Sequence, residues 1–118
     1  MLGKDVKVVL SKEAKKVYSY LNKESEKSKI EQSILKAVNQ KAVFLKQNPH
    51  YGNPIAKRLI PKKLIKKYQL NNLFRIELPN FWRMLYTLSE GESKIEVIAF
   101  VLEICDHKDY DKLFRYKS

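Results

Sequence analysis

The hydrophobic pattern of this chain changes its period twice, from strand to helix and back to strand, and these changes limit the folds available to it. From residue 14 to residue 45, apolar residues recur every three or four positions, which is typical of helices with one buried face. Polar residues 22–27 interrupt the pattern. Ser28 and Glu31 form a capping box that restarts it, and Asn48-Pro49 ends it. The sequence therefore predicts a helical hairpin, with Ile30, Ile34, Ala37, Val38, Ala42 and Leu45 on the buried stripe of its second helix.

Strand patterns stand on both sides of this hairpin. Residues 4–10 are short and β-branched, and Ser11 follows as an N-cap for the first helix. Residues 73–78 alternate apolar and polar, residues 81–89 are aromatic and β-branched, and residues 95–104 are apolar on both faces, as in a central strand. Turn signals at Pro79-Asn80 and at residues 90–92 make these three segments an antiparallel meander.

The predicted fold class is α+β: one domain over residues 1–118, in the order β-α-α-β-β-β, with a small antiparallel sheet packed on the helical hairpin. Residues 106–116 are predicted to add a short helix. Residues 50–54 are predicted to be a loop, and residues 57–60 a short edge strand limited by Pro61. Residues 62–68 have too few apolar positions to fix a period. The hairpin covers one sheet face, and Arg75 and Glu77 point to the other, which must be solvated or hold a partner.

The positive charge is concentrated in one part of the chain. The sequence has 24 Lys and Arg against 13 Asp and Glu, a net charge of +11, and residues 32–76 hold ten basic residues and no acid. A run without acids concentrates positive potential, so a polyanion is the favoured partner, with an acidic protein or a membrane surface as alternatives. The predicted phosphate-contacting residues are Lys57, Arg58, Lys62, Lys63, Lys66 and Lys67.

Several chemistries have little support in the sequence. No apolar run reaches the ~18–20 residues of a membrane span, and residues 1–11 do not resemble a signal peptide. We therefore expect a cytoplasmic protein that does not bind membranes.

Cys105 has no partner for a disulfide or a zinc site and is predicted to be a buried small hydrophobe. The acidic residues around His107 have no recognised metal-ligand spacing, so no metal or other cofactor is expected.

Residues 73–110 resemble a known family of toxins. The stretch L-F-R-I-E-L-P-N-F-W-R-M-L-Y, residues 73–86, precedes an apolar strand that ends in H-K-D-Y. Together with the preceding strand and helical hairpin, it is similar to the RelE/ParE toxins of type II toxin–antitoxin systems. The resemblance implies one of two activities: RelE-like members cleave mRNA at the ribosomal decoding site, and ParE-like members poison DNA gyrase. It also implies a cognate antitoxin that wraps and neutralises the toxin.

The resemblance implies a site on adjacent strands. Arg83 matches the phosphate-contacting Arg of the family, and the alternative is an ion pair with Glu77 or Glu96. Arg75 and Glu77 lie where RelE-like members have two basic residues, so Glu77 is a departure: it is either the general base or a neutraliser of Arg75. His107 and Tyr110 match a C-terminal pair that would serve as acid and base-stacking residue; otherwise they are a surface residue and a core residue.

The favoured function is a RelE-like toxin, an mRNA interferase that cleaves ribosome-bound mRNA without a metal and so inhibits translation. Its partners would be an antitoxin, the ribosome and mRNA; the sequence leaves a homodimer open. The alternatives are a ParE-like gyrase inhibitor and a non-catalytic nucleic-acid-binding protein that keeps the fold. Tyr51, Tyr68 and Trp82 are candidates for base stacking, although each is more typical of a core residue.

Overall fold

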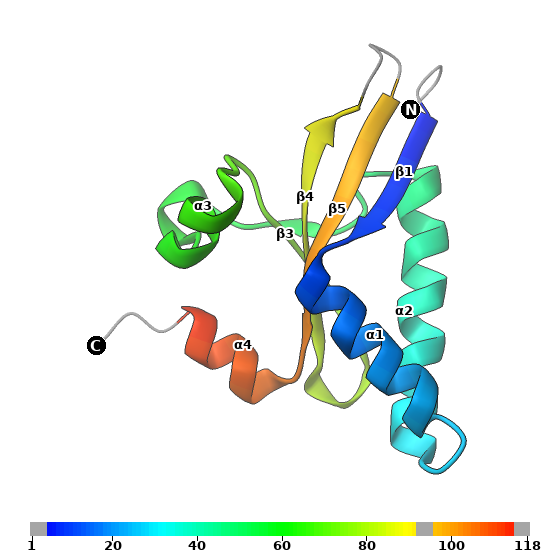
Figure 1. Ribbon diagram of the computed structural model, residues 1–118. Coiled ribbons are helices and arrows are strands. Elements are labelled where there is room, and N and C mark those ends of the chain that lie inside the picture. Colours follow the sequence, from blue (N-terminus) through cyan, green and yellow to red (C-terminus); the bar gives the residue numbers. More distant parts are fainter. Residues whose placement is uncertain (1–4, 92–95, 115–118) are drawn as a thin grey trace.

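A computed structural model describes residues 5–91 and 96–114. Its strands are β1 (Asp5–Leu10), β2 (Asn53–Pro54), β3 (Phe74–Glu77), β4 (Arg83–Glu90) and β5 (Glu96–Cys105). Its helices are α1 (Lys12–Glu24), α2 (Lys29–Gln47), α3 (Lys62–Tyr68) and α4 (His107–Phe114), with 3-10 turns η1 (Lys57–Leu59) and η2 (Pro79–Phe81). Figure 1 shows α1 and α2 on one side of the sheet and α3 and α4 on the other.

The five strands form one mixed sheet in the order β1-β5-β4-β3-β2. The predicted antiparallel meander is confirmed for β3, β4 and β5. The prediction of a wholly antiparallel sheet is wrong, because β1 pairs with β5 in parallel, from Asp5 opposite Glu96 to Leu10 opposite Val101. β5 pairs with β4 in antiparallel fashion along one edge, and β1 pairs with the other edge of β5 in parallel.

The predicted helical hairpin is confirmed as α1 and α2. The Ser11 hydroxyl accepts a hydrogen bond from Ala14 N at 3.0 Å and so caps α1. At the start of α2, Ser28 Oγ accepts a bond from Glu31 N at 3.5 Å, which is one half of the predicted capping box. The Glu31 carboxylate accepts from the Ser28 hydroxyl and not from its backbone N–H, which donates to the Glu24 carbonyl at 3.0 Å. Ile30 is 54% exposed, so its predicted place on the buried stripe is wrong; it lies in the first turn of α2, beyond the contact with the sheet.

The segment between α2 and β3 differs most from the prediction. The predicted edge strand at residues 57–60 is wrong, since Lys57–Leu59 forms η1. The edge strand is instead β2, inside the predicted loop, where Asn53 pairs with Arg75 and Pro54 with Phe74. The seven-residue helix α3 begins after Pro61, which is its N-cap and whose carbonyl accepts a hydrogen bond from Ile65 N at 3.2 Å.

The sheet has a hydrophobic core on each face. The larger core joins α1 and α2 to residues such as Met84, Tyr86 and Val101. The second core joins α3 and α4 to Leu85 and Leu102. The face predicted to be open is therefore partly covered.

The register of β4 and β5 shifts at Leu85/Tyr86, where Leu85 pairs with Glu103 and Tyr86 with Val101. Leu102 is the extra residue of this bulge, and it joins the second core.

The C-terminal helix is confirmed over His107–Phe114, and Asp106 directly precedes it. Residues 115–116 of its predicted span, and residue 92 of the predicted turn at 90–92, lie outside the described residues. Within residues 5–91 and 96–114, no helix has the length and apolar character needed to cross a membrane.

Candidate functional site

The register of two strands brings three charged residues together. Arg75 and Glu77 are two residues apart on β3 and so point to the same face, and Glu77 pairs with Arg83 on β4. Arg83 Nε lies 3.3 Å from one Glu77 carboxylate oxygen, and Arg75 Nε lies 3.4 Å from the other. Neither Nε makes a hydrogen bond, so these are off-axis ion pairs rather than bidentate bridges. We call these three residues the Arg75–Glu77–Arg83 cluster.

Helix α4 adds a tyrosine to this cluster. Arg75 Nη1 donates a hydrogen bond to the Tyr110 hydroxyl at 3.1 Å, and the Arg83 guanidinium carbon lies 5.2 Å from the centre of the Tyr110 ring. The hydrogen bond that Arg75 donates to Tyr110 raises the pKa of Arg75, so this side chain stays a cation. Tyr110 is itself held by Phe114, whose ring stacks on it at 4.5 Å. One aromatic ring therefore contacts both guanidinium groups.

His107 reaches the cluster through Phe81. The two rings meet edge to face, 6.1 Å between centres and 70° between planes. The carbonyl of Phe81 accepts a hydrogen bond from Arg83 Nη1 at 2.7 Å. Phe81 was not among the predicted site residues; its signal in the sequence is an aromatic residue placed directly after a Pro-Asn turn.

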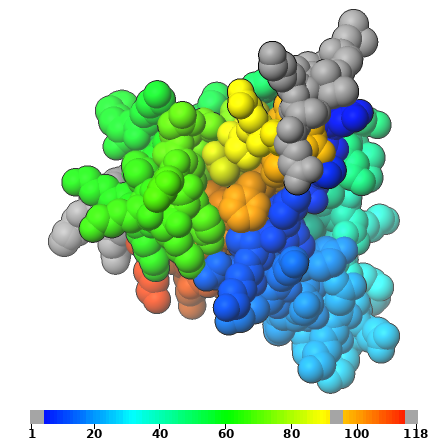
Figure 2. Space-filling model, turned by 45° about the horizontal axis from the view of Figure 1, so that its top comes forward, coloured from blue at the N-terminus to red at the C-terminus, as the bar shows by residue number. Residues whose placement is uncertain are grey.

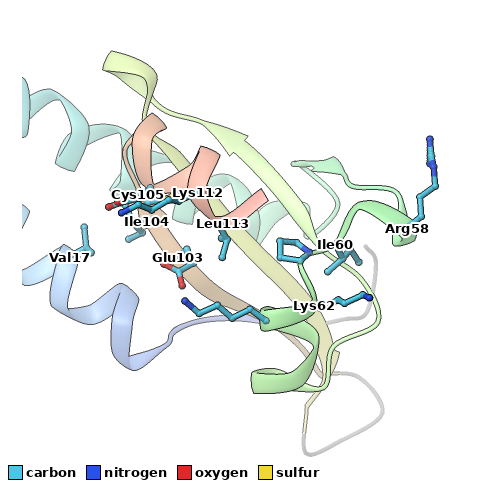
Figure 3. A pocket seen from close by; sticks show the side chains of 12 residues that line it. Val17, Arg58, Ile60, Lys62, Glu103, Ile104, Cys105, Lys112 and Leu113 are labelled. Atoms are coloured by element: carbon cyan, nitrogen blue, oxygen red, sulfur yellow. The ribbon is translucent and has the colours of Figure 1, made fainter. Parts of the chain in front are cut away.

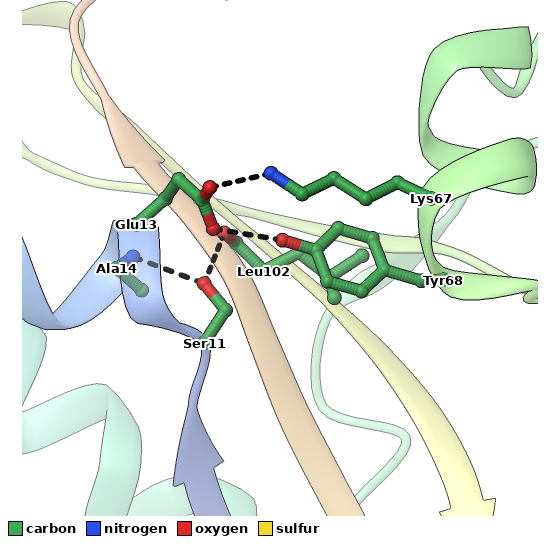
Figure 4. A network of polar contacts seen from close by, with 6 residues as sticks. All are labelled: Ser11, Glu13, Ala14, Lys67, Tyr68 and Leu102. Atoms are coloured by element: carbon green, nitrogen blue, oxygen red, sulfur yellow. Dashed lines mark hydrogen bonds and ion pairs between the residues drawn. The ribbon is translucent and has the colours of Figure 1, made fainter.

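The six predicted phosphate-contacting residues lie on η1 and α3, on the same side of the sheet as the cluster. Lys67 already has a partner within the chain: it binds the Glu13 carboxylate, which also accepts a bond from the Tyr68 hydroxyl at 3.0 Å (Figure 4). The hydrogen bond from Lys67, followed by smaller contributions, lowers the pKa of Glu13 to about 2. These contacts join α3 to α1, while Ser11 Oγ donates to the Leu102 carbonyl at 2.7 Å.

A cavity of about 810 Å³ lies between α1, α3, β5 and α4 (Figure 3). Its charged lining residues are Arg58, Lys62, Lys63, Lys112, Glu103 and Asp109. Burial raises the pKa of Glu103. Cys105 is buried, as predicted, and this burial raises the pKa of its thiol to about 12. In the space-filling view of Figure 2, part of β5 remains visible between α3, β4 and the β1–α1 segment.

A smaller cavity of about 230 Å³ connects the basic segment to the cluster. Its lining includes Ala56 and Leu59 at η1, and Arg75 and Tyr110 from the cluster. The chain around η1 therefore lies beside Arg75 and Tyr110 through Ala56 and Leu59, while its basic side chains do not line this cavity.

The other predicted chemistries can be placed as well. Trp82 packs against the larger core, Tyr68 is partly buried, and Tyr51 is 40% exposed. Across the described ranges, no three His, Cys, Asp or Glu side chains gather closely enough to hold a metal ion, so the acidic residues around His107 do not form a chelating group.

No protein-family model matches this sequence, and neither a curated protein nor a solved structure is similar enough to count as a match. The resemblance to RelE/ParE toxins therefore rests on the order of elements and on residues 73–110.

Proposed function

We propose that this protein is a RelE-like toxin of a type II toxin–antitoxin pair, a metal-independent endoribonuclease that cleaves ribosome-bound mRNA. One observation carries the proposal: two guanidinium groups flank the Glu77 carboxylate, on the face of the sheet opposite the helical hairpin. Two cations suit a phosphate in which negative charge builds up during cleavage, and a carboxylate between them suits a proton acceptor.

The proposed reaction is a transesterification within the RNA. Glu77 takes the proton of a 2′-hydroxyl, whose oxygen forms a bond to the adjacent phosphorus. The bond from phosphorus to the 5′-oxygen breaks, and His107 protonates that leaving oxygen. The products are a 2′,3′-cyclic phosphate and a 5′-hydroxyl. Arg83 and Arg75 stabilise the charged phosphorane, and Tyr110 holds both guanidinium groups in place.

The basic residues of η1 and α3 would supply affinity for the RNA backbone without choosing a sequence. The segment that carries Lys57 and Arg58 adjoins the cluster at the smaller cavity, where its Ala56 and Leu59 line one wall and Arg75 and Tyr110 another. A cognate antitoxin would have to cover this basic surface, which favours an acidic partner.

The test compares the wild type with Arg83→Ala on ribosomes programmed with a defined mRNA. We expect cleavage that leaves 2′,3′-cyclic phosphate ends, and a rate lower by about 10²–10³-fold in the variant, the range seen when one group that stabilises transition-state charge is removed. Lys36→Ala is the matched control, because it removes an exposed cation from α2, which packs on the other face of the sheet. It should cleave as the wild type does.

Two results would count against this function and favour its alternatives. Inhibition of supercoiling by purified gyrase, without RNA cleavage, would indicate a ParE-like inhibitor. Salt-sensitive RNA binding without any cleavage product would indicate a non-catalytic nucleic-acid-binding protein.

A further inference from the structure

The turn η2 holds an aromatic side chain in an unusual backbone conformation. Asn80 and Phe81 have φ angles of 59° and 62°, so both lie in the left-handed region. Asn adopts this region readily, whereas a bulky residue does so only under strain. Glycine at position 81 would relieve that strain, and yet the chain has phenylalanine there. A strained residue of this kind justifies asking what its side chain does.

The ring of Phe81 contributes little to the core. The side chain is 71% exposed, the highest value among the exposed large apolar side chains of the described residues. Its neighbour Trp82, by contrast, packs against the larger core. Strain and exposure both cost stability, and the described contacts of the ring within the chain amount to the edge of His107. The open face of the ring therefore fits a ligand better than it fits a structural role.

The surroundings of the ring indicate the chemistry of that ligand. The Phe81 carbonyl accepts a hydrogen bond from Arg83 Nη1 at 2.7 Å, so the guanidinium is held beside the backbone of the residue that carries the ring. Pro79, Asn80 and Glu77 around it are exposed and mostly polar, which gives no continuous apolar patch for a protein partner. A nucleotide carries a flat base and a charged phosphate one sugar apart, and it matches an aromatic face beside an arginine.

We propose that Phe81 is a stacking platform for the base next to the phosphate held by Arg83, with His107 closing one edge of the subsite. This inference rests on the proposed function, because it takes the phosphate at Arg83 to belong to RNA. Stacking on one aromatic side chain is tolerant of sequence, since every base has a π-face. Phe81 therefore fixes the position of the substrate and does not read its identity.

The experiment uses an RNA that cannot be cleaved: a 2′-O-methylated hexanucleotide with 2-aminopurine at a central position. Phe81→Asn removes the ring and keeps a residue that tolerates positive φ, so the turn and the Arg83 contact should survive. We expect its affinity to fall about 5- to 100-fold, which corresponds to the ~1–3 kcal/mol of one base–aromatic stack. The quenching of 2-aminopurine fluorescence on binding should disappear as well.

Two further variants complete the design. Phe81→Trp keeps an aromatic face and should retain both the affinity and the quenching. Tyr20→Ala removes an aromatic side chain that is 46% exposed on α1, away from the cluster, and should behave as the wild type does. Thermal unfolding of Phe81→Asn should occur at or above the wild-type temperature, since the strain is relieved.

The outcomes separate the two proposals. If Phe81→Asn binds and quenches as the wild type does, the stacking platform is wrong, whether or not the RNA is cleaved. A change confined to self-association, measured by sedimentation, would make Phe81 a protein contact and would also overturn the inference. If the wild type binds and quenches the probe but never cleaves ribosome-bound mRNA, the stacking platform stands and the nuclease function fails.

Discussion

The change in cleavage rate caused by Glu77→Gln distinguishes two roles for this carboxylate: general base, or neutraliser of the two arginines. The substitution keeps the size and shape of the side chain and removes its charge and its ability to take a proton. If Glu77 is the general base, cleavage should slow by about 10²–10⁴-fold, the usual contribution of a positioned acid or base. If it only neutralises the arginines, the variant should cleave at least as fast as the wild type.

The structure sets the size of a second effect, on binding. Glu77 makes two ion pairs, at 3.3 and 3.4 Å, with side chains that are 56% exposed for Glu77, 36% for Arg75 and 19% for Arg83. Pairs as exposed as these contribute about 0.2–1 kcal/mol each. A phosphate must compete with the carboxylate for the same guanidinium groups, so removing that charge should tighten RNA binding about 2- to 30-fold. Slower cleavage with tighter binding is therefore the expected combination.

The assay measures single-turnover cleavage on programmed ribosomes and, separately, binding of the uncleavable hexanucleotide at one fixed salt concentration, because affinity for RNA depends on salt. Glu90→Gln is the matched control: it makes the same chemical change at the opposite end of β4, on an exposed residue. Both of its measurements should equal those of the wild type. Unchanged cleavage together with tighter binding in Glu77→Gln would refute the role of base, and weaker binding would show that Glu77 holds the arginines in place.

Two further predictions concern stability. The buried Tyr86 hydroxyl donates to the Pro49 carbonyl at 2.8 Å and accepts from Gly52 N at 2.9 Å, so Tyr86→Phe should lower the free energy of unfolding in urea by about 2 kcal/mol; an unchanged value would mean that both groups find other partners. The Glu13 carboxylate has a pKa lowered to about 2, chiefly by Lys67, against 4.5 when unperturbed. Its contribution is present above about pH 4.5 and is lost as the pH falls toward 2. Glu13→Gln lacks this contribution at every pH, so its acid unfolding, monitored by circular dichroism, should start at higher pH than that of the wild type, and identical curves would contradict the sign.

Much of the fold could be predicted from the spacing of apolar residues along the sequence. The helical hairpin and the three meander strands have enough apolar positions in phase to fix their type and their buried face. Helix α3 could not be predicted this way, because Leu64 and Ile65 are its only aliphatic residues and its position depends on Tyr68 and Lys67 reaching Glu13, more than fifty residues away. The parallel pairing of β1 with β5 could not be predicted for the same reason. It joins strands from opposite ends of the described chain, and local periodicity does not determine which strands pair.

The candidate site, like the fold, could be predicted from the sequence only in part. Alternation along β3 and a short turn to β4 are enough to place Arg75, Glu77 and Arg83 near one another. The contact of Tyr110 with both guanidinium groups depends on how α4 lies on the second core, which no local signal gives. The exposure of Phe81 was also hidden, because an aromatic residue in a strand-like segment is ordinarily a core residue.

Glu77 is an acidic residue at a position where the resemblance to RelE-like toxins would place a basic one. The distribution of charge along the rest of this chain is compatible with that difference. With Glu77 between them, the two arginines of the cluster carry a net charge of only +1, which gives weak attraction for RNA over a distance. The basic residues of η1 and α3, on the same side of the sheet and without an acid in the surrounding sequence from residue 32 to residue 76, can supply that attraction instead. Affinity and chemistry would then reside in two adjoining surfaces. Under the proposed function, this division would let the cluster contain a carboxylate that takes a proton, because the basic residues of η1 and α3 would attract the RNA.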